Sequence, residues 1–362
     1  MACSPTRVVT LAFLSLMPAF VCDSATAQVS GLIEFSESGR LQRGIPLVSL
    51  ASEIVVMGRD GWLHSIDPLQ PETKFKSLEG QYEPLSAPEL RNQLRAEFGK
   101  DFEVVATQNF LVVQPLGRGD RWAKLFEQSH RGFVSYMSKR GVNVRQGRFP
   151  MVAIVFPDRG AMYDEFKKQK IDVSRVAGIY SNNSNRVMTH DGGHLTSIIA
   201  TVRHEAAHQS AFNTGVHSRL NDTPKWITEG IGQLFEPAAV TTSTTASLRR
   251  QRANEDSLQV LKKSYPGKNN PEFAQAVMNL VSGDEMFADE DHVMDAYSVA
   301  WAMMFYLAER QPREFAAILK HTAMRRPFVT YQRDERRADF EEVIGMNPYE
   351  FSRRVSWFLE SL

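Results

Sequence analysis

The chain has 362 residues, enough for one large domain or two smaller ones. Its 42 basic and 42 acidic residues balance, and the first 27 residues hold one of each. This balance gives no basis for a nucleic-acid partner or for attraction to an anionic membrane surface.

The first 27 residues have the pattern of a secretory signal peptide. Arg7 supplies a positive charge, an apolar run follows over residues 8–21, and residues 25–27 form a small-x-small cleavage site. The apolar run is too short to span a bilayer comfortably, and no later stretch reaches the length of a membrane helix. We therefore expect cleavage near Ala27 and export to the periplasm or the medium, without a stable membrane anchor.

Both cysteines, Cys3 and Cys22, lie inside this segment. Cys22 would suit a lipid-anchored start, but Val21 before it is a poor match to the small residue that such sites need. We therefore expect an exported protein that has no disulfide and depends on its hydrophobic core.

Residues 28–85 form a β-rich segment, which we expect to be a small β-sheet or barrel module. The sequence Arg59-Asp60-Gly61 is a tight-turn signal between two apolar stretches, which predicts a hairpin. No residue cluster in this segment suggests chemistry. Strands are expected at residues 31–35, 47–50, 54–57 and 62–66.

The second domain is expected to span residues 86–362. Ser86 and Glu89 form a capping box that opens a helix ended by Gly99. Asp120 is expected to cap a longer helix, and another helix is expected near Phe166. Strands are expected at residues 102–106, 110–113, 151–156, 176–180 and 186–188.

Beyond these strands the pattern is mostly helical. A helix at residues 196–212 is followed by a second one that starts at Pro224, with Thr223 available as its cap. Further helices are expected at residues 248–263, 271–281, 294–309, 312–321, 339–344 and 348–359.

The most informative motif is His204-Glu205-Ala206-Ala207-His208. Histidines four residues apart share one helical face, so both imidazoles can point at one metal ion. Glu205 is placed to act on a water molecule at that ion, and Glu229 can complete a His-His-Glu set, the ligands of an open catalytic zinc site. The competing interpretation is an ordinary helix with two partly exposed histidines, which the apolar and small neighbours of the motif disfavour.

The third ligand has alternatives. A metzincin would carry a histidine six residues after His208, but Thr214 stands there. His217 lies in a loop, and Asp222 precedes the second helix. Glu229 is favoured because a helix that crosses the first one is a rigid platform for a ligand.

These motifs resemble those of the gluzincin metallopeptidases, the thermolysin-like group of the peptidase MA clan. The chain is more closely similar to a family of secreted bacterial proteins of unknown function with a peptidase MA-like domain. That likeness covers about residues 102–307. It is carried by Gly178-Ile-Tyr180, Asn185-Arg-Val187, His204-Glu205-Ala-Ala-His208-Gln209 and Pro224-x-Trp226-x-x-Glu229-Gly230.

The resemblance implies an α+β, zincin-like fold, with a mixed sheet over the motif helix and a helical C-terminal half. It does not imply a substrate. Many gluzincins carry an aspartate four residues after the glutamate ligand to orient the first histidine, but Gln233 occupies that position here. The orienting group must then come from elsewhere, and Glu236 and Asp222 are both candidates.

The mechanism expected from this ligand set is hydrolysis. One Zn²⁺ held by His204, His208 and Glu229 would keep a fourth position for water and lower the pKa of that water, and Glu205 would accept its proton. The resemblance implies an oxyanion donor from the helical half. Tyr297 is the candidate, with packing as its alternative role, and His292 is a weaker choice.

Residues 178–188 are the expected edge strand beside the cleft, where an extended peptide could add as a further strand. Tyr180 and Arg186 would then contact substrate, although an ordinary strand explains both. His190 and His194 could indicate a second metal site, but a polar, glycine-rich connection is the simpler interpretation.

The main hypothesis is an exported zinc metallopeptidase that acts on a peptide or protein substrate. One alternative is a catalytically weak or inactive peptidase-like binding protein of the cell envelope. Another is a hydrolase of non-peptide amides or esters. The sequence does not give the oligomeric state or the cleavage preference.

Overall fold

The computed structural model describes residues 31–37, 40–70, 75–168, 176–242 and 249–362. The expected signal peptide lies outside these ranges, together with Cys3 and Cys22. None of the helices in the described ranges combines the length and the apolar character needed to cross a bilayer.

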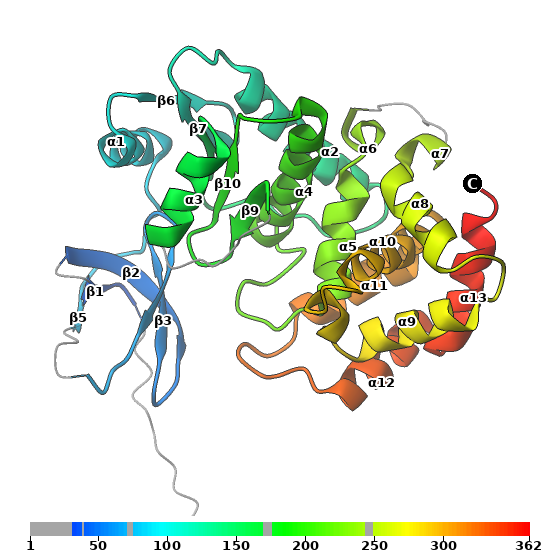
Figure 1. The fold of residues 1–362 in the computed structure, drawn as a ribbon. Coiled ribbons are helices and arrows are strands. Elements are labelled where there is room, and N and C mark those ends of the chain that lie inside the picture. Colours follow the sequence, from blue (N-terminus) through cyan, green and yellow to red (C-terminus); the bar gives the residue numbers. More distant parts are fainter. Residues whose placement is uncertain (1–30, 38–39, 71–74, 169–175, 243–248) are drawn as a thin grey trace, which may run out of the picture.

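The first described segment folds into an antiparallel five-stranded sheet in the order β4-β3-β2-β1-β5 (Figure 1). The predicted hairpin is confirmed, because β3 and β4 pair from Ile54–Ile66 to Met57–Leu63. Strand β5 was not predicted, and β2 starts earlier than expected and carries a register shift after Pro46. The strands are β1 (Ile33–Glu37), β2 (Arg40–Ser49), β3 (Ile54–Gly58), β4 (Leu63–Ile66) and β5 (Phe75–Ser77).

A second, mixed sheet has the order β6-β7-β8-β10-β9. Strands β7, β8 and β10 are parallel neighbours, and β6 and β9 pair antiparallel at the two edges. The edge expected over residues 178–188 is therefore confirmed only for β9, because β10 lies inside the sheet between β8 and β9. The strands are β6 (Phe102–Ala106), β7 (Phe110–Pro115), β8 (Met151–Phe156), β9 (Gly178–Ser181) and β10 (Arg186–His190).

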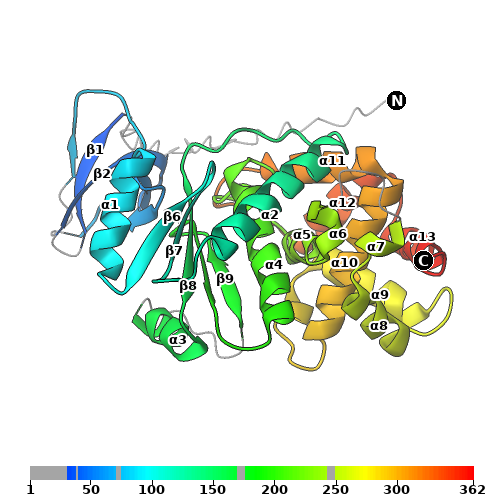
Figure 2. The ribbon, with the colours of Figure 1, turned by 90° about the horizontal axis from the view of Figure 1, so that it is seen from above.

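Helices cover both faces of this sheet (Figure 2). On one face, side chains of α1 (Ala87–Phe98) and α3 (Arg159–Lys168) pack against alternate strand residues such as Val113 and Ile154. On the other face, α2 (Arg121–Ser138) and α4 (Leu195–Asn213) pack against the intervening residues. The period-two pattern of the strands thus divides the side chains between two cores.

The predicted start of α1 is confirmed. The Ser86 hydroxyl accepts from the Glu89 backbone N–H, and the Glu89 carboxylate accepts from the Ser86 N–H at 2.8 Å. The prediction for Asp120 was wrong in its mechanism. Asp120 occupies the N-cap of α2, but its carboxylate caps no backbone N–H and instead pairs with Lys124 at 2.7 Å.

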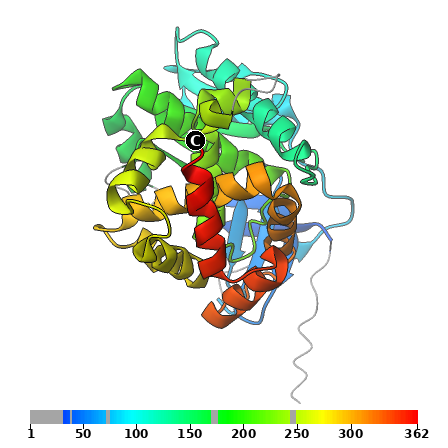
Figure 3. The ribbon, with the colours of Figure 1, turned by 90° about the vertical axis from the view of Figure 1, so that its right-hand side faces the viewer.

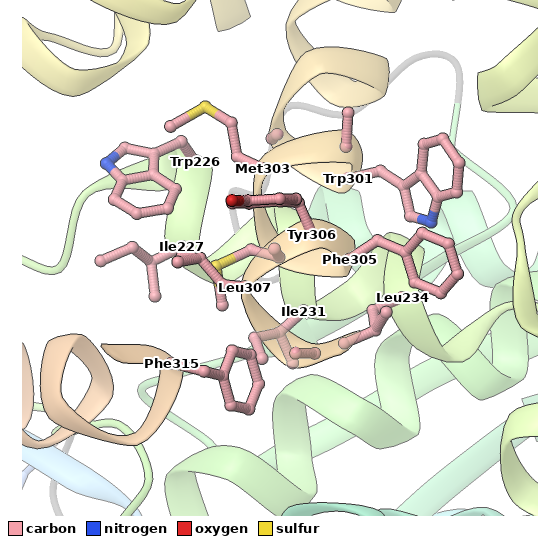
Figure 4. Close-up of a cluster of buried hydrophobic side chains, with 14 of the residues drawn as sticks. Trp226, Ile227, Ile231, Leu234, Trp301, Met303, Phe305, Tyr306, Leu307 and Phe315 are labelled. Carbon is pink, nitrogen blue, oxygen red and sulfur yellow. The ribbon is translucent and has the colours of Figure 1, made fainter. Parts of the chain in front are cut away.

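The C-terminal half is helical, with α10 (Val293–Arg310) at its centre (Figures 1 and 3). Figure 4 shows Trp301 and Phe305 of α10 in the same buried cluster as Ile231 of α5 and Phe315 of α11. The other helices are α5 (Lys225–Phe235), α6 (Ala238–Thr242), α7 (Arg249–Arg252), α8 (Glu255–Ser264), α9 (Pro271–Ser282), α11 (Pro312–Ala323), α12 (Arg333–Ile344) and α13 (Pro348–Leu359), with a 3₁₀ turn at Glu285–Phe287.

Several helix boundaries differ from the predictions. Helix α12 begins at Arg333, six residues before the expected start at Asp339. The single helix expected over residues 248–263 is divided into α7 and α8, because the Asn254 side chain caps the second helix by accepting from the Ser257 N–H. At the start of α5 it is Pro224 that takes the N-cap position, and the buried Thr223 hydroxyl has no partner. Asp284 instead accepts from the Lys225 N–H at 2.9 Å.

The N-terminal sheet contacts the larger unit at the loops beside α4. The Leu63 N–H donates to the Asn183 carbonyl at 2.8 Å, and Arg219, in the loop after α4, donates to the Gly61 carbonyl at 2.7 Å. The β3–β4 turn therefore lies against the loops that flank the motif helix.

Candidate metal centre

Helix α4 carries the motif and is held firmly beneath the sheet. Ile198, Val202 and Ala206 pack into the core under the strands. The fully buried Gln209 amide donates to the backbone carbonyls of Val152 and Asn185 at 3.0 and 2.8 Å. The opposite side of α4, which carries the two histidines of the motif, therefore has a fixed direction toward α5.

The structure brings His204, His208 and Glu229 together. The Glu229 Oε2 atom lies 3.4 Å from His204 Nε2 and 3.6 Å from His208 Nε2. One ligand atom from each of the three residues lies within 4.8 Å of the others. This is the three-residue group that the motif predicts, with one member on α5 and two on α4.

These separations fit a metal ion. Two ligand atoms that each lie about 2.0–2.1 Å from a tetrahedral zinc ion are roughly 3.4 Å apart. The observed nitrogen–oxygen distances of 3.4 and 3.6 Å are close to that value. The donor set, two imidazoles and a carboxylate, is also one that binds zinc.

The protonation of the group reflects its close packing. Burial alone would raise the pKa of Glu229, but the charges and hydrogen bonds of His208 and His204 outweigh it and hold that pKa far below its ordinary value. Burial would lower the pKa of His204, yet hydrogen bonds with Glu229 and Glu236 raise it well above 6.5. A cation is thus favoured at this point, and a metal ion would compete with a proton for it.

The orienting partner of His204 is Glu236. Its Oε1 atom lies 2.9 Å from His204 Nδ1, which leaves Nε2 directed at Glu229. Asn254 fixes this carboxylate by donating to Glu236 Oε2 at 2.8 Å and to the Gln233 side chain at 2.9 Å. Of the two candidates, Glu236 is the one that contacts His204. Gln233 supports Glu236 indirectly, because both accept from the Asn254 amide.

Asp222, the other candidate, lies in a different environment. Its carboxylate accepts from the Tyr331 N–H at 3.2 Å and is 3.5 Å from an Arg336 nitrogen. It contributes no atom to the metal-ligand group.

Two glycines allow α5 to approach its neighbours. A Cβ atom on Gly232 would lie closer than 3.0 Å to three ring atoms of His204. A Cβ on Gly230 would clash with Met304 and with the Ala300 carbonyl of α10. The absent side chain at Gly232 is therefore a condition for the observed position of the His204 ring.

Glu205 is held by the edge strand. Its Oε2 atom accepts from the Tyr180 backbone N–H of β9 at 2.7 Å, and its side chain is largely buried. The carboxylate thus lies between the motif helix and the strand that would bind an extended peptide.

Tyr297 lies beside the same group. Its ring centroid is 6.5 Å from that of His204, and it also contacts Phe287. Burial, together with the nearby Glu229 and Glu205 carboxylates, raises the pKa of Tyr297 far above its ordinary value. The hydroxyl therefore stays protonated and can donate a hydrogen bond. His292, the weaker sequence candidate, is exposed at the N-cap of α10.

The remaining histidines do not join the group. His190 is buried and accepts from the Gly192 N–H at 3.3 Å, and His194 is exposed at the N-cap of α4. His217 is buried, but it is not among the clustered ligand atoms. Within the described ranges no second group of three potential metal ligands is found.

Part of the chain is similar to a known protein family. Residues 198–329 match the model of the family described as "Protein of unknown function (DUF1570)". The match contains all three metal-ligand residues and Glu205, and it ends beyond α11. It does not reach the strands over residues 102–190, where the sequence resemblance was expected to begin. No curated protein matches the chain.

Proposed function

We propose that this protein is an exported zinc-dependent peptidase of the gluzincin type. The observation that carries the proposal is the position of Glu229, whose carboxylate oxygen lies 3.4 and 3.6 Å from the two imidazole nitrogens. Side chains from two separate helices converge on a point where a divalent cation fits. Export is the part of the proposal that rests on the N-terminal sequence alone.

His204, His208 and Glu229 would hold the ion. When bound, a zinc ion lowers the pKa of the water molecule that it holds and polarises a substrate carbonyl. With the ion bound, Glu236 would accept from His204 Nδ1 and leave Nε2 for the metal, and such outer carboxylates also raise the basicity of the imidazole.

Glu205 would act as the general base and then as the general acid. It takes a proton from the attacking water as the new carbon–oxygen bond forms, and it gives that proton to the nitrogen when the carbon–nitrogen bond breaks. The Tyr180 N–H, 2.7 Å from Oε2, positions this carboxylate. The Tyr297 hydroxyl, which stays protonated, would donate to the carbonyl oxygen that gains negative charge.

The surroundings of the candidate metal centre favour a peptide substrate over a compact small molecule. Strand β9 is an edge of the mixed sheet, and a sheet edge binds an extended chain through its backbone groups. The same strand carries the N–H that holds Glu205, so a peptide bound along β9 would lie next to the proposed base.

The deciding test is Glu205→Gln. We expect the purified protein to carry one zinc per chain, and the variant to keep that zinc while losing about 10²–10⁴-fold in peptide hydrolysis. Exposed Glu342→Gln on α12 is the matched control and should change neither quantity. An unchanged rate in Glu205→Gln would falsify the proposed mechanism.

The same assay distinguishes the alternatives. Full zinc loading without cleavage of any member of a broad peptide library would favour a peptidase-like binding protein. Cleavage of a non-peptide amide or ester, identified by mass spectrometry of the products, would favour a different hydrolase. The intact Glu205 beside the metal ligands favours the peptidase, because a binding protein has no need of a general base.

A further inference from the structure

A cavity of about 660 Å³ lies between the end of α2, the loop after α4 and helix α11. Its wall is formed by residues 141–145, 215–218 and one side of α11. Much of the lining is apolar or small, including Ala316, Ala323 and Leu319. The cavity is therefore large enough to hold an apolar part of a ligand together with a polar group of the same ligand.

The charges around this cavity are all positive. Arg145, Arg313 and Lys320 line it, and no aspartate or glutamate is among the lining residues. All three side chains are exposed, and none of them pairs with a carboxylate in the described part of the chain. Three unpaired cations around one cavity favour an anion.

A buried polar group in the same wall gives a second, independent indication of a ligand. His217 lines the cavity and is 2% exposed, and neither of its ring nitrogens has a hydrogen-bond partner of acceptable geometry. Buried polar atoms of native proteins are nearly always hydrogen-bonded, since leaving one unpaired is costly. A ligand atom in the cavity that forms a hydrogen bond with the imidazole would explain why His217 has no partner within the protein.

His217 also connects the cavity to the motif helix. Its ring packs edge-on against Phe212 of α4 with centroids 5.3 Å apart. A ligand held beside His217 would therefore lie at the C-terminal end of the helix that carries two of the proposed metal ligands.

We propose that this cavity binds a carboxylate of the peptide substrate. Arg145, Arg313 and Lys320 surround the carboxylate, His217 supplies a ring N–H, and the apolar wall accepts the adjoining side chain. The identity of the ligand as a peptide rests on the proposed function, whereas the anion site itself does not. The carboxylate can belong to the C-terminus of the peptide or to an acidic side chain.

Isothermal titration calorimetry on the full mature chain tests the site without catalysis. The probes are an alanine-leucine hexapeptide with a free C-terminal carboxylate, the same peptide amidated, and an amidated version with one internal glutamate. Binding is measured with metal-free protein and with zinc-loaded Glu205→Gln. We expect the free acid to bind about tenfold more tightly than the neutral amide. The glutamate peptide shows whether the carboxylate of an acidic side chain binds in place of the C-terminal carboxylate.

Exposed cations can be changed without disturbing the core. Arg313→Gln and Lys320→Gln should each weaken the free-acid peptide about three- to tenfold and leave the amide unaffected. Arg337→Gln, an exposed arginine on α12 outside the cavity, is the matched control and should have no effect. Raising the salt concentration should reduce the difference between acid and amide, because partly exposed charges are screened.

The outcomes separate this proposal from the proposed function. Equal binding of the free-acid, amidated and glutamate peptides, or no effect of Arg313→Gln and Lys320→Gln on the peptide that binds most tightly, overturns the carboxylate site. Carboxylate-dependent binding to the metal-free chain that is lost in these variants supports the site even if no peptide is cleaved. Cleavage without a preference for a carboxylate leaves the peptidase standing and removes this site.

Discussion

At the scale of single residues, the arrangement of His204, His208 and Glu229 depends on a position without a side chain as well as on the ligand side chains themselves. Glycine inside a helix costs roughly 0.8–1.0 kcal/mol relative to alanine, so it persists where packing requires it. Gly232 is such a position, because a Cβ there would fall within 3.0 Å of the His204 ring.

Replacing Gly232 with alanine should therefore displace a metal ligand without touching any ligating atom. We expect zinc affinity to fall by about tenfold or more, since a ligand must be held to about 0.5 Å. Zinc titration with a competing chelator measures this. Gly132→Ala is a matched control, because its Cβ would clash with Thr241 away from the site and should lower stability alone. Retained zinc affinity in Gly232→Ala would show that the ring position is not critical.

Glu236 is the second residue whose role can be isolated. Glu236→Gln should lower zinc affinity about 10- to 100-fold, because an amide raises the basicity of His204 less than a carboxylate does. The comparison variant is Asp222→Asn, a carboxylate that contacts Tyr331 and Arg336 and no metal ligand. Equal zinc affinity in the two variants would contradict the assignment of Glu236.

At the scale of elements, local signals were sufficient wherever a residue's partners are close in sequence. The capping box of α1, the β3–β4 turn and most strands of the two sheets were predicted because apolar periodicity and turn residues define them. The start of α5 was predicted to within one residue, but its capping group was not, since Asp284 lies 59 residues further along the chain. The three-residue strand β5 carries too little pattern to be recognised.

The residues of the candidate site also fall into those that the local sequence predicts and those that depend on packing between helices. His204, Glu205 and His208 follow from the spacing within one helix, and Glu229 from its place on the next helix. The choice between Glu236 and Asp222 depends on how α5 is rotated against α4, and no sequence pattern gives that angle. Gly232 was missed although a glycine inside a helix is itself a signal of close packing.

The attachment of α4 to the sheet gives a prediction at this scale. Gln209→Met removes the donor of two buried hydrogen bonds, to the carbonyls of Val152 and Asn185. The Gln209 side-chain oxygen itself has no partner, so its loss offsets part of the cost. We expect the free energy of unfolding, from urea titration, to fall by about 2 kcal/mol. Gln259→Met, on the exposed side of α8, should change it little.

At the scale of the whole molecule, one buried carboxylate joins the sheet-bearing part to the helical half. Glu309 of α10 pairs with Arg140, just beyond the end of α2, at 2.5 Å and with Arg252 of α7 at 2.6 Å. Its side chain is only 4% exposed. Arg140 also donates to the Ala308 carbonyl, so the contact fixes α2 against α10.

This cluster predicts how stability responds to acid. Burial alone would raise the pKa of Glu309, but Arg252 and Arg140 outweigh it and lower that pKa below 4.5. A carboxyl group with a depressed pKa stabilises the fold fully above its unfolded pKa, and that stability is lost as the pH falls through the folded value. Glu309→Gln should cost about 2–3 kcal/mol at neutral pH, because it removes the negative charge that Arg140, Arg249 and Arg252 share.

Below pH 4.5 the cost of Glu309→Gln should shrink, since the wild-type carboxyl group itself becomes protonated there. Urea unfolding of both proteins between about pH 3 and pH 7 measures the difference between them directly, and groups that titrate in both cancel. Glu350→Gln on α13, whose partner Arg354 is half exposed, is the control and should give a small and nearly constant difference. A difference for Glu309→Gln that stays constant over the whole range would mean that the junction of α2 and α10 does not depend on this charge.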